Sequence, residues 1–109
     1  MDQKLLSITI PTWNRSCTLD KSLSLLLPQV DKFKKKIEII ICDNHSTDGT
    51  EGVINKWFNI YNHLEIVVFY QQINTGFYGN FKKCKELAKG KFIWMLSDDD
   101  FIQAGVLNN

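Results

Sequence analysis

The most informative segment of this sequence comprises residues 37–50, which read IEIIICDNHSTDGT. Its first part is almost entirely apolar and β-branched, as in a strand that is covered on both faces of a sheet. The polar turn that follows contains Asp48, and Glu51 stands three residues later, which is the spacing of a capping box at a helix start. The segment therefore predicts a buried strand, a turn and a helix.

The remainder of the chain repeats this alternation of short apolar runs and amphipathic segments. We expect strands over residues 5–10, 37–42, 64–70 and 91–96, with Pro11 ending the first. Three stripes at helical spacing predict helices between them: Leu19, Leu23, Leu26 and Leu27, stopping around Pro28; Val53, Ile54, Trp57, Phe58 and Tyr61; and Phe81, Cys84, Leu87 and Ala88, with Gly90 as a left-handed cap. The fold class is therefore α/β: a three-layer, Rossmann-like, mostly parallel sheet with helices on both faces.

Length and composition limit the classes of protein to consider. A chain of 109 residues and 12.6 kDa holds one domain, residues 1–109, and its 44% hydrophobic and 23% charged residues are typical of a globular protein. The net charge of +1 provides no long-range field, so we expect no nucleic-acid partner.

Cysteine spacing and hydropathy indicate a cytoplasmic protein. Cys17, Cys42 and Cys84 are odd in number and far apart, which suggests neither a disulfide framework nor a zinc site. The start of the chain lacks a secretion pattern, and no segment has the roughly 18 apolar residues of a membrane-spanning helix. Peripheral attachment at the inner face of a membrane stays open.

Acidic side chains follow the fourth expected strand. In parallel α/β sheets ligands bind beyond the carboxyl ends of the strands, and there Asp98, Asp99 and Asp100 are adjacent. Their mutual repulsion is relieved by a hard divalent cation, Mg²⁺ or Mn²⁺, which prefers oxygen ligands. The alternative is a solvated acidic turn that caps a following helix.

The turns after the other strands hold further candidates. Asp43 can accept hydrogen bonds from a base or ribose, or can close a local Asx-turn. The capping box accounts for Asp48. His45 is interpreted as an exposed loop residue. Arg15, the only arginine, can pair with a phosphate or form a structural ion pair. Gly76 and Gly79 precede a helix, where backbone amides can approach a ligand. The lysines from Lys82 to Lys91 are interpreted as a solvated helix face, with the alternative that one of them reaches a diphosphate.

Four blocks together resemble the family 2 glycosyltransferases of GT-A fold: residues 7–15, SITIPTWNR; 38–50, EIIICDNHSTDGT; 74–80, NTGFYGN; and 97–100, SDDD. The resemblance covers the chain from about residue 5 onwards. It implies a nucleotide-diphosphate-sugar donor, a divalent metal at a DXD-type motif, inverting transfer to a saccharide or lipid-linked acceptor, and a place in cell-surface polysaccharide synthesis.

The same resemblance assigns roles to individual residues. It places the base and ribose against Pro11, Thr12 and Asp43, with Asp98 near the ribose, and Asp99 and Asp100 at the metal. It adds a second set to the nucleotide-binding residues, namely Asn14, Arg15, Gly76 and Asn80. Ser97 departs from the commoner motif, in which an Asp often stands at that position. All these assignments require Asp43 and the aspartates after the fourth strand to face one crevice.

Transferases of this fold are longer than 109 residues. We therefore interpret the chain as the nucleotide-binding half of a transferase, cut at its carboxyl-terminal end, with the catalytic base expected beyond Asn109. Apolar surface left without its other half favours self-association of such a piece. The alternative function is a non-catalytic nucleotide-binding or interaction domain of the same fold.

Overall fold

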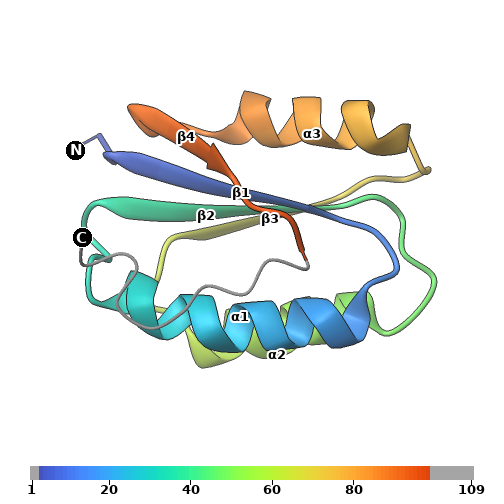
Figure 1. The fold of residues 1–109 in the computed structure, drawn as a ribbon, viewed down its shortest axis with the longest axis horizontal. Helices are drawn as coiled ribbons and strands as arrows, with labels where there is room; N and C mark the ends of the chain where they lie inside the picture. Colours follow the sequence, from blue (N-terminus) through green and yellow to red (C-terminus); the bar gives the residue numbers. More distant parts are fainter. Residues whose placement is uncertain (1–2, 99–109) are drawn as a thin grey trace.

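The chain forms a four-stranded parallel sheet between two layers of helices. The computed structural model describes residues 3–98. The elements along the chain are β1 (Leu6–Thr12), α1 (Ser16–Asp31), β2 (Ile37–Asp43), α2 (Thr50–Ile60), β3 (Ile66–Tyr70), α3 (Gly76–Leu87) and β4 (Phe92–Met95). Helices α1 and α2 cover one face of the sheet and α3 covers the other (Figure 1). The predicted fold class is confirmed.

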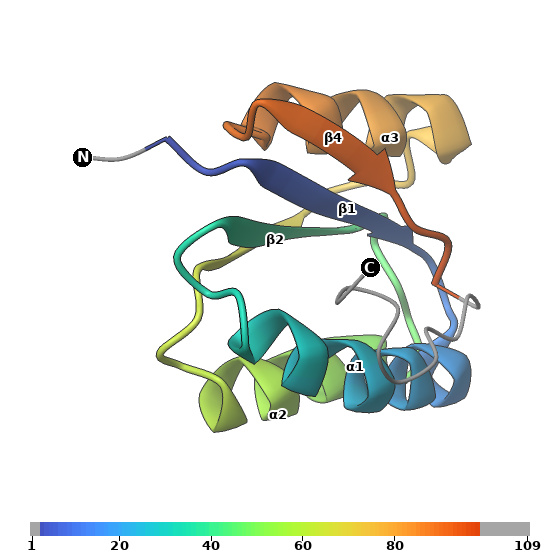
Figure 2. The ribbon, with the colours of Figure 1, turned by 60° about the vertical axis from the view of Figure 1, so that its left-hand side comes forward.

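The strands lie in the order β3-β2-β1-β4, and each neighbouring pair is parallel. The chain therefore places β1, β2 and β3 successively in one direction and then returns to add β4 on the other side of β1. The view in Figure 2 shows β4 beside β1 with α3 above them. This reversal of strand order lies between β1 and β4, which is where sheets of this kind open a crevice at their carboxyl ends.

Alternation along the strands divides the core between the two faces. Ile8 and Ile10 of β1 and Ile39 and Ile41 of β2 pack with the leucine stripe of α1 in the larger cluster. The opposite face of β2 presents Ile40 and Cys42 to Cys84 of α3. Contact with Cys42 and burial raise the pKa of the Cys84 thiol, so this thiol stays protonated and acts as a small apolar side chain. No helix of residues 3–98 is long and apolar enough to cross a membrane.

Two boundaries that were expected at prolines are wrong. Pro11 does not end β1, which continues to Thr12 because Pro11 still pairs with Cys42 in the register with β2. The register with β4 already ends at Thr9, so the missing amide hydrogen disrupts no paired residue there. Helix α1 likewise continues past Pro28 to Asp31. A proline in the last turn removes one backbone bond, and the complete burial of Val30 favours the extra residues.

Gly90 has a different role from the one expected. Gly76 is the one glycine with positive φ in the described residues, and α3 ends at Ala88 in an extended conformation, so Gly90 is not a left-handed cap. A Cβ atom at Gly90 would lie 2.6 Å from the Ser7 hydroxyl oxygen and 2.7 Å from the Ser7 amide nitrogen. Glycine is required here because the α3–β4 connection approaches the backbone of β1.

We expect the Gly90→Ala substitution to lower the free energy of unfolding by about 1–3 kcal/mol, because β1 would have to move to accept the methyl group. Chemical denaturation of both proteins measures the difference. Gly52→Ala is the control, because a Cβ atom there meets nothing within 4 Å and the position lies in helix α2. Equal loss in the two variants would contradict the packing argument.

Candidate functional site

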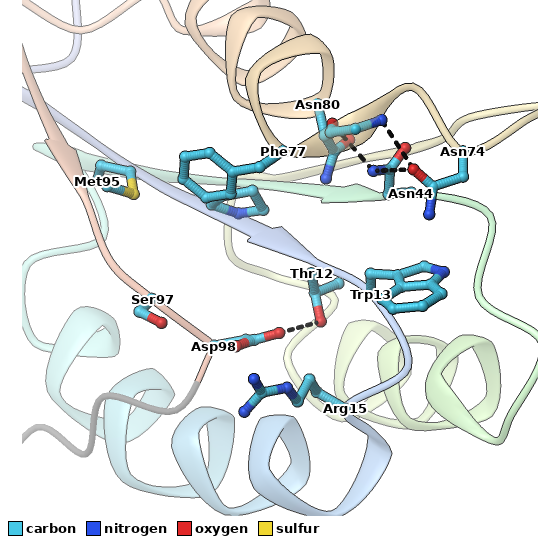
Figure 3. A pocket seen from close by; sticks show the side chains of 12 residues that line it. Thr12, Trp13, Arg15, Asn44, Asn74, Phe77, Asn80, Met95, Ser97 and Asp98 are labelled. Carbon is cyan, nitrogen blue, oxygen red and sulfur yellow. Dashed lines mark hydrogen bonds between the residues drawn. The ribbon is translucent and has the colours of Figure 1, made fainter.

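A cavity of about 620 Å³ opens at the carboxyl ends of β1 and β4, where the strand order reverses. It combines the turns that follow all four strands, as Figure 3 shows for its labelled side chains. The lining residues are Pro11, Thr12, Trp13, Arg15, Asn44, Asn74, Gly76, Phe77, Asn80, Met95, Ser97 and Asp98. The position agrees with the general placement of ligand sites in such sheets.

The cavity contains one described carboxylate, that of Asp98, which is buried. The Thr12 hydroxyl donates a hydrogen bond of 2.8 Å to Asp98 Oδ2, so the ends of β1 and β4 are joined through side chains (Figure 3). On the main chain, the Ser22 hydroxyl donates to the Asp98 carbonyl oxygen at 2.9 Å. Both the carboxylate and the peptide of Asp98 are therefore held by buried hydroxyls.

Arg15 also lines the cavity. Figure 3 shows its side chain extending from the start of α1 towards the end of β4, on the side of the cavity where Asp98 lies. Its amide donates to the Thr50 hydroxyl at 3.2 Å, so its backbone is fixed against α2. A guanidinium at this place adds positive charge beside a carboxylate, an arrangement suited to an anionic ligand.

Asp43 and Asn14 are outside the cavity lining. The Asp43 carboxylate accepts hydrogen bonds from the amide and the hydroxyl of Ser46, at 3.0 and 2.5 Å, so it closes the local turn. Asn14, with φ of 48°, donates its amide to the Ser46 hydroxyl and accepts from the Thr47 amide, both at 2.8 Å. Together these two residues connect the turns after β1 and β2. Of the residues expected to share one crevice, Asp98 lines the cavity, Asp43 is not among the lining residues, and Asp99 and Asp100 lie outside the described residues.

Gly76 and Asn80 lie in the cavity, at the start of α3. Gly76 has φ of 78°, a conformation that favours glycine, and its amide donates to the Asn74 side chain at 2.8 Å. Asn80 is buried and donates to the Cys42 carbonyl at 2.8 Å, which fixes α3 to β2. The amino-terminal end of α3, with its positive dipole end, therefore faces the same cavity as Asp98 and Arg15.

Sequence reasoning missed Asn44, which organises this part of the cavity. Its amide group donates to Asn74 Oδ1 at 3.0 Å and to the Gly76 carbonyl at 3.1 Å, and its Oδ1 accepts from the Thr75 amide at 2.8 Å. The one signal in the sequence that could have identified Asn44 is its position directly after a predicted buried strand. His45, by contrast, is exposed as predicted.

The apolar part of the cavity was also missed. Trp13, Phe77 and Met95 line it while remaining between 41% and 58% exposed. Trp13 lies apart from Phe77 and Met95 in Figure 3. Aromatic faces beside hydrogen-bonding groups form a typical binding site for a flat, polar ring. Single exposed aromatic residues carry no such signal in a sequence, because only the fold shows that they share one cavity.

Asp99 and Asp100, the expected metal ligands, lie outside the described residues, and within residues 3–98 no three His, Cys, Asp or Glu side chains cluster as a metal site. Mg²⁺ is commonly held by one or two carboxylates together with water and substrate phosphates. The Asp98 carboxylate and the Ser97 hydroxyl supply hard oxygen donors at the cavity, so the described residues fit part of such a shell.

Asp48 stabilises the turns around the site and gives them a pH dependence. It accepts from the Thr50 amide at 2.9 Å and the Ser16 amide at 3.3 Å, so it caps two helices. The bond from the Thr50 hydroxyl is the main cause that lowers the pKa of Asp48 below its ordinary 3.8. The predicted capping box is wrong in detail, because Gly49 occupies the N-cap position of α2, and Asp48 instead accepts from the first residues of α2 and α1.

A carboxyl group whose folded pKa is lowered stabilises the protein above its unfolded pKa, and this stabilisation is lost as pH falls through the folded value. We therefore expect the free energy of unfolding to fall less in Asp48→Asn than in the unsubstituted chain as the pH is lowered from about 5 to about 2. Thermal unfolding across this range measures it. Asp20, whose pKa is lowered by Lys56, leaves a pH dependence in both proteins. If the melting temperatures of the two proteins depend identically on pH, the stabilising role of Asp48 is contradicted.

Several known proteins are similar to this chain in sequence. The chain is 42% identical over 96 residues to abequosyltransferase RfbV of Salmonella typhimurium, covering 88% of this chain and 28% of that protein. It is 31% identical to GalNAc(5)-diNAcBac-PP-undecaprenol beta-1,3-glucosyltransferase of Campylobacter jejuni, covering 94% and 32%. The chain thus spans about a third of the length of these relatives.

Solved structures agree with the fold. Mannosyltransferase PcManGT from Pyrobaculum calidifontis, in complex with GDP-Man and Mn²⁺, matches with a TM-score of 0.87 at 20% identity, over 100% of this chain and 32% of that one. TarS 1–349 of S. aureus matches with a TM-score of 0.75 at 26% identity, over 95% and 30%. The model of Glycosyl transferase family 2 matches residues 7–109, and the chain therefore belongs to this family.

Proposed function

We propose that the cavity binds the nucleoside diphosphate sugar that donates the sugar in a glycosyl transfer reaction. The observation that carries this proposal is the buried Asp98 carboxylate, held by Thr12 at the point where strand order reverses. Its surroundings offer an apolar wall for a base, a helix amino terminus and one guanidinium for phosphates.

The base and ribose are proposed to lie against Pro11, Thr12 and Asp43, with Asp98 at the ribose. The carboxylate of Asp43 already accepts two bonds from Ser46, but an ionised carboxylate offers about four lone-pair positions, so a further donor can be accepted. Arg15 and the start of α3, with Gly76, are proposed for the diphosphate. Asn14 and Asn80 act by holding the surrounding turns.

We propose Asp99 and Asp100 as ligands of Mg²⁺ or Mn²⁺. When bound, the cation would neutralise the negative charge that develops on the departing diphosphate. In the inverting reaction that we propose, a carboxylate takes the proton of an acceptor hydroxyl, and the hydroxyl oxygen attacks the anomeric carbon as the bond from that carbon to the nucleoside diphosphate breaks. No residue among 3–98 is assigned as that base.

The acceptor is proposed to be a saccharide or a lipid-linked sugar in the synthesis of a cell-surface polysaccharide. One support is the Escherichia coli relative named UDP-Glc:alpha-D-GlcNAc-diphosphoundecaprenol beta-1,3-glucosyltransferase WfaP, which is 34% identical over 98 residues. Such an acceptor would place the protein in the cytoplasm, at the inner face of the membrane. The relatives differ in the sugar that their names give, so the donor sugar is left as a class.

Calorimetric titration of the chain with UDP, GDP, CDP and TDP, with Mn²⁺ and with a chelator, tests the proposal. At least one nucleotide should bind, and Mn²⁺ should strengthen the binding. Adenosine, which lacks the diphosphate, is the control ligand and should show no effect of Mn²⁺. Absence of binding by all four nucleotides would overturn the proposed function.

A further inference from the structure

Ser22 lies in α1 and is only 2% exposed, between the buried side chains of Leu19, Leu23 and Leu26. A hydroxyl is not needed for packing at this place, because the neighbours form an apolar stripe against the sheet. Its hydrogen bond to the Asp98 carbonyl, 76 positions away in the chain, crosses from α1 to the segment after β4. This contact links the helix layer to the candidate site.

We propose that Ser22 is a positioning residue for Asp98 in the candidate site, an inference that rests on the proposed function. The carbonyl that Ser22 binds belongs to the peptide joining Asp98 to Asp99. Ser22 therefore fixes the main chain of Asp98, while Thr12 fixes its carboxylate at 2.8 Å. The two contacts come from different elements and hold one residue at two points.

The segment after β4 depends on such contacts because sheet pairing ends before it. The last paired residue of β4 is Met95, opposite Thr9, and the Leu96 amide then donates to the Thr9 carbonyl at 2.8 Å. Beyond Leu96, the hydroxyls of Thr12 in β1 and Ser22 in α1 both donate to Asp98. Side-chain hydroxyls from two elements therefore hold Asp98 after the paired part of β4 has ended.

A serine in the interior of a helix commonly bonds a carbonyl of its own helix. Ser24 behaves in this way, since its hydroxyl donates to the Lys21 carbonyl at 2.7 Å and is exposed. Ser22 differs from it because its hydroxyl donates to the Asp98 carbonyl, which lies outside α1. Ser22 and Ser24 therefore provide a pair for comparison, because the alanine substitution removes a bond to the Asp98 carbonyl at one position and a bond to the Lys21 carbonyl of the same helix at the other.

The test measures the affinity of the chain for its preferred nucleoside diphosphate with Mn²⁺. Loss of one hydrogen bond of ordinary strength corresponds to an affinity about 5- to 10-fold lower for Ser22→Ala. Ser24→Ala should bind like the unsubstituted chain, and Ser22→Thr, which keeps the hydroxyl, should retain most of the affinity. Ile54→Val, which removes a methylene from the core away from Asp98, controls for a general loss of stability.

Hydrogen exchange provides a readout that does not depend on the ligand. The amides of residues 96–98 should exchange faster in Ser22→Ala than in Ser24→Ala or Ile54→Val. Unchanged affinity and exchange in Ser22→Ala would overturn the positioning role while leaving the proposed function intact. If the unsubstituted chain binds no nucleoside diphosphate, the proposed function fails first, and this inference fails with it.

Discussion

Replacing Asp98 and Asp99 together by alanine should lower the affinity for a nucleoside diphosphate with Mn²⁺ on the order of 100-fold, because hydrogen bonds to charged groups contribute about 1.5–3 kcal/mol each. Asp98 is buried at the cavity and bonded to Thr12, so its removal also leaves that hydroxyl without its acceptor. Titrating both proteins with and without Mn²⁺ measures the effect, and only the unsubstituted chain should respond strongly to the metal.

Asp31→Ala is the matched control for this experiment. It removes a carboxylate from the last residue of α1, where Asp31 pairs with His63 at 2.8 Å, and it is not among the residues lining the cavity. The affinity of Asp31→Ala for the nucleoside diphosphate with Mn²⁺ should equal that of the unsubstituted chain. Asp98→Asn separates charge from shape, because it keeps an oxygen that can accept from Thr12. If the double variant keeps the metal-dependent affinity of the unsubstituted chain, Asp98 and Asp99 do not belong to the site.

Replacing Glu38 by alanine should lower the free energy of unfolding by about 3 kcal/mol, since a buried hydroxyl and a partly buried amide lose their acceptor. Glu38 is 1% exposed in β2, and its Oε2 accepts from the Ser7 hydroxyl of β1 and, at 2.6 Å, from the Lys89 amide. The Gly90 amide donates to the same Ser7 hydroxyl at 2.7 Å. This network joins β1, β2 and the α3–β4 connection.

For a domain of this size such a loss should lower the melting temperature by about 10 °C or more. Glu65→Ala is the control, because Glu65 is exposed directly before β3 and surface substitutions usually change stability by less than about 0.5 kcal/mol. Ser7→Ala should cost less than Glu38→Ala, since the carboxylate still accepts from Lys89. A melting temperature of Glu38→Ala equal to that of Glu65→Ala would contradict the structural role of the buried network.

The candidate site was predictable in part, for reasons that differ between residues. Asp98, Arg15 and Gly76 follow or precede regular elements, and parallel strands bring such positions to one edge whatever their side chains do. Asp43 stands in an equivalent place, yet its carboxylate is directed to Ser46 within the same turn. Strand position predicts which backbone segments meet, but not which of two acceptable partners a carboxylate takes.

The residue patterns by themselves determined the alternation of strands and helices and the parallel α/β class. They also placed the turns after the four strands at one edge of the sheet. Both follow because apolar periodicity and strand ends are local properties of the chain. The tertiary structure alone decided that Gly90 touches Ser7, that α1 continues past Pro28, and that Ser22 reaches Asp98. These contacts join residues far apart in the chain, and their energies depend on distances that no local pattern encodes.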